Sequence, residues 1–316
     1  MTTPPRSAYI AWIAVCVIWG TTYLGIRVAL EAVPPALMGG FRWTIAGTML
    51  AVFALARGQR LPGPALWPSL ALQGLLMLGF GNGFVNWAEQ YVPSGLAAVT
   101  LATSPFWMSG VEALRADGER LSRGALAGLI LGFSGILVLV WPDLHLGDAA
   151  GLKFTLGVIA LQVACLGWAI GSSYSKRHPH GSSVIADTAV QMLFGGLMML
   201  AAGTLMGEWP RVHLEGRGFW ALGYLVFVGS IGGFVSYIYA LQHLPVATVS
   251  LYAYANPLIA VALGALVLGE PFTARTVVAM SIVFAGMALV RSRKPAPAAA
   301  TAARVGDAVE VQNAKC

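Results

Sequence analysis

The sequence predicts an all-α polytopic membrane protein with ten transmembrane helices, built as two inverted five-helix repeats. Three observations support this prediction: long apolar runs, an internal repeat and an uneven distribution of positive charge. Of the 316 residues, 57% are apolar and only 10% are charged, against about 25% charged residues in a typical soluble domain. A chain of this length with so few charges cannot cover its outer surface for contact with water, so we expect it to lie in lipid.

The apolar runs are continuous and about 20 residues long, the length of a helix that crosses the hydrocarbon core of a bilayer. A membrane β-barrel would instead show alternation with a period of two over short segments. The first run is too long for the apolar region of a signal peptide and lacks a clear cleavage site, so we expect it to be retained. The ten candidate spans are residues 8–29, 35–56, 66–87, 94–114, 123–141, 152–174, 184–206, 218–241, 246–268 and 273–291.

The basic residues predict the orientation of these spans. An even number of spans puts both termini on one side of the membrane. The termini and connections on that side carry thirteen Lys or Arg residues, whereas the opposite side carries five. By the positive-inside rule, the side with thirteen is cytoplasmic. Topology thereby accounts for the net charge of +6, and we expect no nucleic-acid partner.

Short motifs recur at offsets of 151 or 152 residues. Residues 87–93 resemble residues 239–245, and Pro105 recurs as Pro257. Because this period contains an odd number of spans, the second copy enters the membrane from the opposite side. Many secondary transporters are inverted repeats whose halves alternate access to a site at the midplane. The other recurring pairs are Gly20–Tyr23 with Gly171–Tyr174, Gly118-Glu119 with Gly269-Glu270, and Phe133–Gly135 with Phe284–Gly286.

These observations predict four segments along the chain. Residues 1–7 form a cytoplasmic N-terminus, residues 8–141 the first five-helix repeat, and residues 152–291 the second. Residues 292–316 are rich in Pro and Ala and poor in large apolar side chains, so we expect a disordered cytoplasmic tail.

The chain resembles the EamA family of the drug/metabolite transporter superfamily over about residues 8–291. The resemblance rests on Trp19-Gly20, Phe41-Arg42-Trp43, the prolines of spans 4 and 9, and the paired Gly-Glu connections. It implies a ten-helix carrier of the inner membrane, often an exporter of amino acids or related metabolites. Substrates differ widely among family members, so the resemblance does not fix the substrate.

Arg42 is the main charged candidate for a substrate site. It lies about eight residues into the second span beside Gly39, Gly40 and Ala46, and charged groups in a span usually face the interior of the bundle. One hypothesis is that it binds a substrate carboxylate. The alternatives are an ion pair with Glu31 or Glu89, or a side chain that extends to the outer surface.

The other candidates share helical faces through i, i+3 and i+4 spacing. Trp19 and Trp168 lie in the middle of spans that are partners in the repeat, which favours cavity walls over interfacial anchors. Asn82 and Asn86 either bind substrate or join helices through hydrogen bonds. The predicted substrate-binding residues are Trp19, Thr22, Tyr23, Arg42, Asn82, Asn86, Thr103, Trp168, Ser172, Gln191, Tyr237 and Asn256.

Prolines and glycines predict helix shape. Pro105 and Pro257 are expected to kink their spans, either for gating or as a static feature. Gly124, Gly128 and Gly132 repeat at four-residue intervals in the fifth span, which predicts close packing against another helix.

We predict a secondary carrier that exports a small metabolite, such as an amino acid or a related compound, by alternating access. Broad-specificity efflux of drugs or amphipaths is the alternative, and a channel is less favoured. The five histidines fall in loops or at span ends, so we predict no enzyme. Without metal-ligand spacing or a Walker motif, we expect no cofactor and no ATP drive. Glu112 and Asp187 either relay protons or are paired at span ends, so proton or exchange coupling stays open, as does the oligomeric state.

Overall fold

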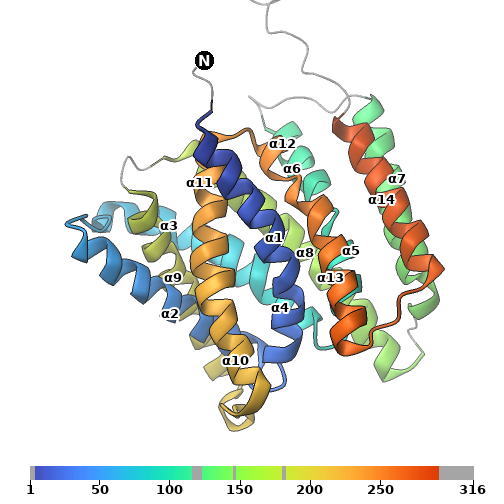
Figure 1. Ribbon diagram of the computed structural model, residues 1–316, viewed down its shortest axis with the longest axis horizontal. Coiled ribbons are helices and arrows are strands. Elements are labelled where there is room, and N and C mark those ends of the chain that lie inside the picture. Colours follow the sequence, from blue (N-terminus) through green and yellow to red (C-terminus); the bar gives the residue numbers. More distant parts are fainter. Residues whose placement is uncertain (1–3, 116–122, 145–146, 180–182, 292–316) are drawn as a thin grey trace, which may run out of the picture.

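The computed structural model describes residues 4–115, 123–144, 147–179 and 183–291, and all regular elements within them are helices. Gly118-Glu119 and the predicted tail lie outside the described residues. Figure 1 shows the arrangement of the helices. They are α1 (Arg6–Ala29), α2 (Pro35–Ala56), α3 (Trp67–Gln73), α4 (Gly83–Ala88), α5 (Ser94–Leu101), α6 (Ser104–Ala113), α7 (Arg123–Val140), α8 (Ala149–Arg177), α9 (Val184–Leu205), α10 (Gly216–Tyr224), α11 (Val235–His243), α12 (Val246–Val249), α13 (Tyr252–Leu268) and α14 (Ala274–Arg291).

Each predicted span coincides with one helix or with helices that follow closely on one another. A π-helical segment, η2 (Gly74–Asn82), joins α3 to α4, and a second, η5 (Leu225–Phe234), joins α10 to α11. Among the described residues, six helices are long and apolar enough to cross a bilayer: Arg6–Ala29, Pro35–Ala56, Leu126–Asp143, Ala149–Arg177, Val184–Leu205 and Gly216–His243. The chain is therefore a polytopic helical protein, and the count of ten spans stays a prediction.

The two prolines that were expected to kink their helices occupy different positions. The fourth predicted span is interrupted at residues 102–103, and Pro105 lies in the first turn of α6, where its missing N–H costs no hydrogen bond. Pro257 lies inside α13, whereas the interruption comes earlier, at residues 250–251. The fourth span is thus interrupted just before Pro105, which begins a new helix, and a gating role for either proline stays a prediction.

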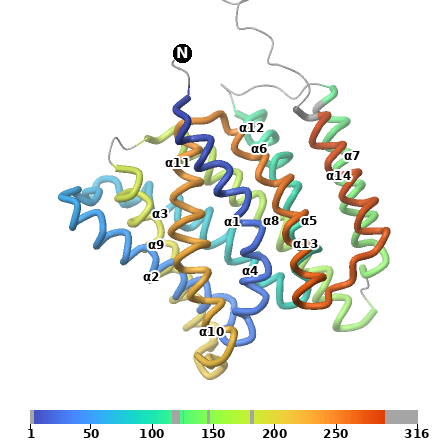
Figure 2. Tube along the Cα trace, in the orientation of Figure 1, coloured from blue at the N-terminus to red at the C-terminus, as the bar shows by residue number. Residues whose placement is uncertain are grey.

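Two pairs of helices form the two sides of the molecule. Helix α2 packs along α9, and α7 packs along α14. The two pairs lie at opposite sides of the views in Figures 1 and 2, with α1, α8 and α13 between them. Helix α1 packs against α13 and η5, while α8 packs against η2 and α6.

Glycines bring α7 and α14 into close contact. A Cβ atom added to Gly286 would lie 2.6 Å from the carbonyl oxygen of Gly128 and 2.6 Å from the backbone nitrogen of Gly132. The predicted close packing at Gly128 and Gly132 is thereby confirmed, and the partner is α14.

Replacing Gly286 with alanine should destabilise the protein, because the backbone of α7 would have to move away from the added methyl group. We expect a cost of about 1–3 kcal/mol, the usual range for overpacking. Gly223→Ala is the matched control, since nothing lies within 4 Å of a Cβ at that position. Thermal unfolding of the purified protein, followed by tryptophan fluorescence, measures both variants. Equal midpoints would contradict the described packing.

Candidate functional site

A cavity lies among α1, α2, α5, α8, α13 and η2. The centre of a water molecule can move through about 80 Å³ of it. One water needs about 10–15 Å³ on this measure, so the cavity has room for several waters or a small metabolite. The predicted residues that line it are Trp19, Thr22, Tyr23, Arg42, Asn82, Trp168 and Asn256.

Four aromatic rings form a cluster at one side of the cavity: Trp19, Trp168, Tyr237 and Tyr252. The ring centroid of Trp19 lies 5.3 Å from that of Trp168, 4.9 Å from Tyr237 and 5.2 Å from Tyr252. Tyr237 is fully buried behind the cavity wall, where its hydroxyl contacts Trp168 Nε1 at 3.0 Å and Ser172 Oγ at 2.8 Å. These hydrogen bonds fix the orientation of the Trp168 ring, so the cluster is a rigid apolar wall.

Arg42 is the charged group of the cavity. Its side chain is buried, its Nε donates to Ser230 Oγ at 2.6 Å, and its guanidinium carbon lies 4.4 Å from the centroid of the Trp43 ring. Glu31 pairs instead with Arg217, at 2.7 and 2.6 Å. The alternatives of a Glu31–Arg42 pair and of an arginine that reaches the outer surface were therefore wrong.

One nitrogen of Arg42, Nη1, has no hydrogen-bond partner among the described residues. Buried donors are almost always paired, and an unpaired one is costly. Arg42 lines the cavity, and a planar guanidinium with an unpaired donor is suited to bind a carboxylate.

The two asparagines of the third predicted span have different surroundings. Asn82 lines the cavity, and its Oδ1 accepts a hydrogen bond from Trp43 Nε1 at 3.2 Å. Asn86 is fully buried away from the cavity, and its Nδ2 donates to the carbonyl oxygen of Pro35 at 3.3 Å. Asn86 therefore joins α4 to the start of α2 and does not reach the cavity.

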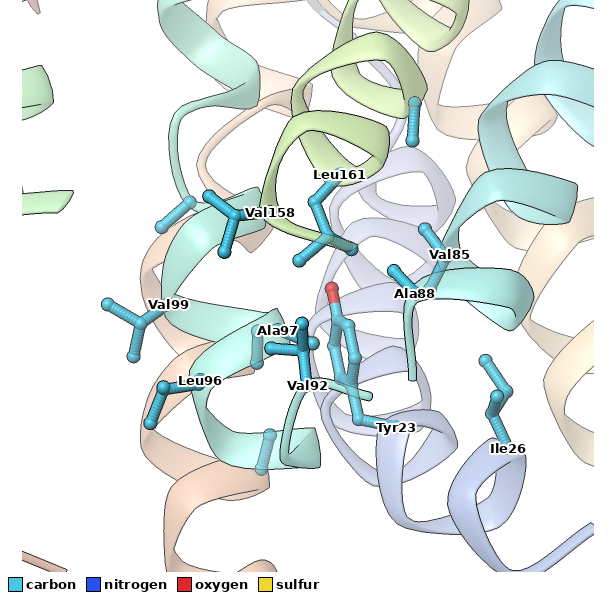
Figure 3. Packing of buried hydrophobic residues seen from close by; sticks show 14 of the residues in the cluster. Tyr23, Ile26, Val85, Ala88, Val92, Leu96, Ala97, Val99, Val158 and Leu161 are labelled. Carbon is cyan, nitrogen blue, oxygen red and sulfur yellow. The ribbon is translucent and has the colours of Figure 1, made fainter. Parts of the chain in front are cut away.

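An apolar cluster adjoins the cavity and includes residues of the connections that follow α1 and α4. Figure 3 shows the Tyr23 ring of α1 surrounded by apolar side chains, including Val92, Ala97 and Leu161. Tyr23 belongs both to this cluster and to the cavity lining. Thr22 faces the cavity as well, and its hydroxyl donates to the carbonyl oxygen of Trp19 at 2.8 Å.

Two more predicted residues use their polar atoms away from the cavity. Thr103 donates to the carbonyl oxygen of Thr100 at 2.8 Å and to Gln162 Oε1 at 3.1 Å. Gln191 contacts the sulfur of Met77 at 3.4 Å from its amide nitrogen. The predicted residues that lie outside the lining are Asn86, Thr103, Ser172, Gln191 and Tyr237.

Trp43, Ser104, Cys165 and Tyr252 line the cavity and were not among the predicted residues. Helical spacing contained a signal for one of them, because Cys165 precedes Trp168 by three positions and so shares its face. Ser104 and Cys165 also contact each other, with 3.3 Å between Oγ and Sγ.

Polar contacts join the two predicted halves at one end of the bundle. Glu112 of α6 forms an ion pair with Arg177 of α8 and accepts a hydrogen bond from Ser173. Arg115 donates to the same serine hydroxyl at 3.1 Å. Of the two possibilities for Glu112, the structure thus bears out a paired residue at a helix end.

The two halves are also joined at the other end of the bundle. The Glu270 carboxylate accepts hydrogen bonds from Ser94 N and Ser94 Oγ, both at 2.8 Å, and from Gly95 N at 2.9 Å. The carboxylate thereby caps the first turn of α5, where unpaired N–H groups and the helix dipole favour a negative charge.

Comparisons with known proteins extend over most of the chain. The profile of the EamA-like transporter family matches residues 6–141 and again residues 155–292. The uncharacterized inner membrane transporter YedA of Escherichia coli strain K12 is 35% identical over 281 residues, which cover 89% of this chain and 89% of YedA. A Salmonella typhimurium protein named "Probable amino-acid metabolite efflux pump" is 27% identical over 283 residues, 86% of this chain and 91% of that protein. A crystal structure of another protein shares the fold, with a TM-score of 0.67 and 22% identity over 90% of this chain and 96% of its own.

Proposed function

Because the chain belongs to the EamA-like transporter family, we propose that it is a secondary carrier that exports a small zwitterionic metabolite, such as an amino acid, by alternating access. The observation that carries the proposal is the cavity between the helices of the two halves, with the buried Arg42 at its wall. The proposal includes ten spans in two inverted halves, residues 8–141 and 152–291, with both termini in the cytoplasm.

Three features support the inverted halves. The family profile matches the chain twice in succession. Helix pairs α2–α9 and α7–α14 each join helices that are partners in the predicted repeat. The π-helical segments η2 and η5 also occupy corresponding positions in the two halves. Two similar halves that face in opposite directions can exchange conformations around a shared site.

The lining of the cavity supports the substrate class. One arginine suits a single carboxylate, whereas a sugar phosphate or nucleotide would need several cations. The Asn82 amide supplies a polar partner, and the rings of Trp19, Trp168 and Tyr252 cover an apolar side chain. The centre of a water molecule can move through only about 80 Å³ of the cavity, which favours a small metabolite over a large amphipathic drug. The direction of transport rests on the efflux named for the Salmonella relative and is part of the proposal.

The contacts between the halves suggest two gates. The Glu112–Arg177 ion pair would close the cytoplasmic end, and the cap of Glu270 on Ser94 would close the outer end. The helix interruptions at residues 102–103 and 250–251 lie between these contacts along spans 4 and 9, where Pro105 and Pro257 also lie. We propose them as the hinges, since a hinge needs only a few residues that absorb the change in backbone angles.

A counterflow experiment tests the proposal. Proteoliposomes loaded with unlabelled amino acids should take up a mixture of ¹⁴C-labelled amino acids, with saturation and competition, while empty liposomes do not. Absence of counterflow by every amino acid would refute the substrate class. Unitary ionic currents through the purified protein would refute the carrier in favour of a channel.

A further inference from the structure

Glu89 is a buried acid that belongs neither to the cavity lining nor to the proposed gates. It lies in the connection between α4 and α5, and its side chain is 0% exposed. Neither carboxylate oxygen accepts a hydrogen bond from any of the described residues. A buried ionised carboxylate without hydrogen bonds is among the costliest groups in a protein, and such groups often carry a function.

Other acids at the same end of the bundle are arranged differently. Glu208 is 1% exposed, but its Oε2 accepts a hydrogen bond from Leu37 N at 2.8 Å. Glu270 accepts three hydrogen bonds at the start of α5. The Oε1 of Glu208 lacks a hydrogen bond but lies 3.7 Å from Arg211 Nη2. Glu89 differs from Glu208 and Glu270 because neither of its carboxylate oxygens accepts a hydrogen bond from the described residues.

Charged and titratable groups face Glu89 from several elements. Arg27 of α1 donates to its backbone carbonyl, and the charges of Arg27, Arg42 of α2 and Glu270 after α13 all act on its carboxyl. Tyr23 of α1 lies within the same field. Burial holds the pKa of the Glu89 carboxyl well above its ordinary value. The positive charges of Arg27 and Arg42 lower this pKa, whereas the negative charge of Glu270 raises it. Burial is the largest of these effects, and the neighbouring charges modulate it.

Glu89 and Arg42 are coupled through this field, and each has a buried polar atom without a hydrogen bond. A ligand carboxylate on Arg42 would cancel part of the positive field that favours the ionised form of Glu89. By linkage, occupation of Arg42 by an anion and protonation of Glu89 favour each other.

We propose that Glu89 is a proton-binding site that takes up one proton when a carboxylate ligand binds at Arg42. This inference rests on the proposed carrier function. The step is a simple protonation: the carboxylate of Glu89 gains a proton from water, and no bond of the ligand changes. Proton and ligand then cross the membrane in the same direction, so a metabolite that accumulates in the cell leaves together with a proton.

The first test follows the protonation of Glu89 by infrared spectroscopy. In the ligand-free wild type, the C=O band of a protonated carboxyl group should grow as the pH falls and vanish as the pH rises, and at a pH where the carboxyl is ionised the amino acid that shows counterflow should restore the band. Glu89→Gln, which imitates the protonated form in size and charge, should lose the band. Glu208→Gln, the matched control at a hydrogen-bonded buried acid, should keep it. A wild type without the band, or a Glu89→Gln variant that retains it, would overturn the proposal.

The second test measures coupling in proteoliposomes with the ¹⁴C-labelled amino-acid mixture. A pH gradient, acidic outside, should drive the label into wild-type liposomes above its outside concentration. Any counterflow that Glu89→Gln retains should be insensitive to the gradient, whereas Glu208→Gln should respond as the wild type does. Wild-type counterflow without any response to the gradient would overturn the proton site and leave the carrier function intact. Absence of wild-type counterflow would instead refute the proposed function, and the infrared band would still report on Glu89.

Discussion

Replacing Arg42 with alanine is expected to abolish transport by removing the ligand's carboxylate partner. The side chain lines the cavity, is bonded to Ser230, and has a buried Nη1 without a hydrogen-bond partner among the described residues. Truncating one partner of a buried charge pair usually costs about 2–5 kcal/mol, which is a loss of roughly 30-fold or more in affinity. The affinity of the purified variant for whichever amino acid shows counterflow, measured by calorimetry, gives this loss directly.

Two further variants make the Arg42 result specific. Arg42→Lys keeps the charge but not the planar pair of donors, so we expect a smaller but clear loss of affinity. Arg217→Ala is the control, because Arg217 is exposed and pairs with Glu31 away from the cavity. If Arg42→Ala is folded and binds the amino acid as tightly as the wild type, Arg42 is not the carboxylate site.

A covalent link between α6 and α8 should stop transport completely. Glu112 and Ser173 are in hydrogen-bond contact across the two proposed halves. In a variant with Glu112→Cys and Ser173→Cys, a short cleavable bis-thiol reagent should join the two helices and hold the cytoplasmic end closed. Counterflow in proteoliposomes should fall to background after cross-linking and return when a reductant cleaves the link.

The single-cysteine variants Glu112→Cys and Ser173→Cys, treated with the same reagent, are the controls. They distinguish the effect of the cross-link from the effect of attaching the reagent to one cysteine. Each should show the same counterflow before and after treatment. Full counterflow by protein that is cross-linked in high yield would mean that α6 and α8 do not move apart during transport, and the proposed cytoplasmic gate would be wrong.

The positions of the helices were predictable because the chain has long apolar runs with charges and prolines between them. The interruptions within spans 4 and 9 were not, because a proline in a sequence marks both a kink and a helix start. Pro105 begins α6, whereas Pro257 lies inside an unbroken α13. Whether a proline kinks a helix or begins a new one depends on the packing of the residues before it.

The candidate site was predictable in part for a similar reason. Polar and aromatic side chains in a span point to the interior of the bundle, and that principle found Trp19, Arg42 and Trp168. It could not distinguish a cavity from a helix–helix contact. Asn86 and Gln191 are interior as expected, but they face Pro35 and Met77. Only the packing of neighbouring helices decides which interior side chain meets empty space.

The cavity of the proposed carrier opens to the two sides of the membrane in turn, and Cys165 is a native reporter of this opening. This thiol lines the cavity and is buried in the described conformation. In a Cys16→Ser, Cys316→Ser variant, a membrane-impermeant thiol reagent should modify Cys165 when added from either side, and the transported amino acid should protect it. Modification from one side only, under all conditions and with ligand present or absent, would contradict alternating access through this cavity.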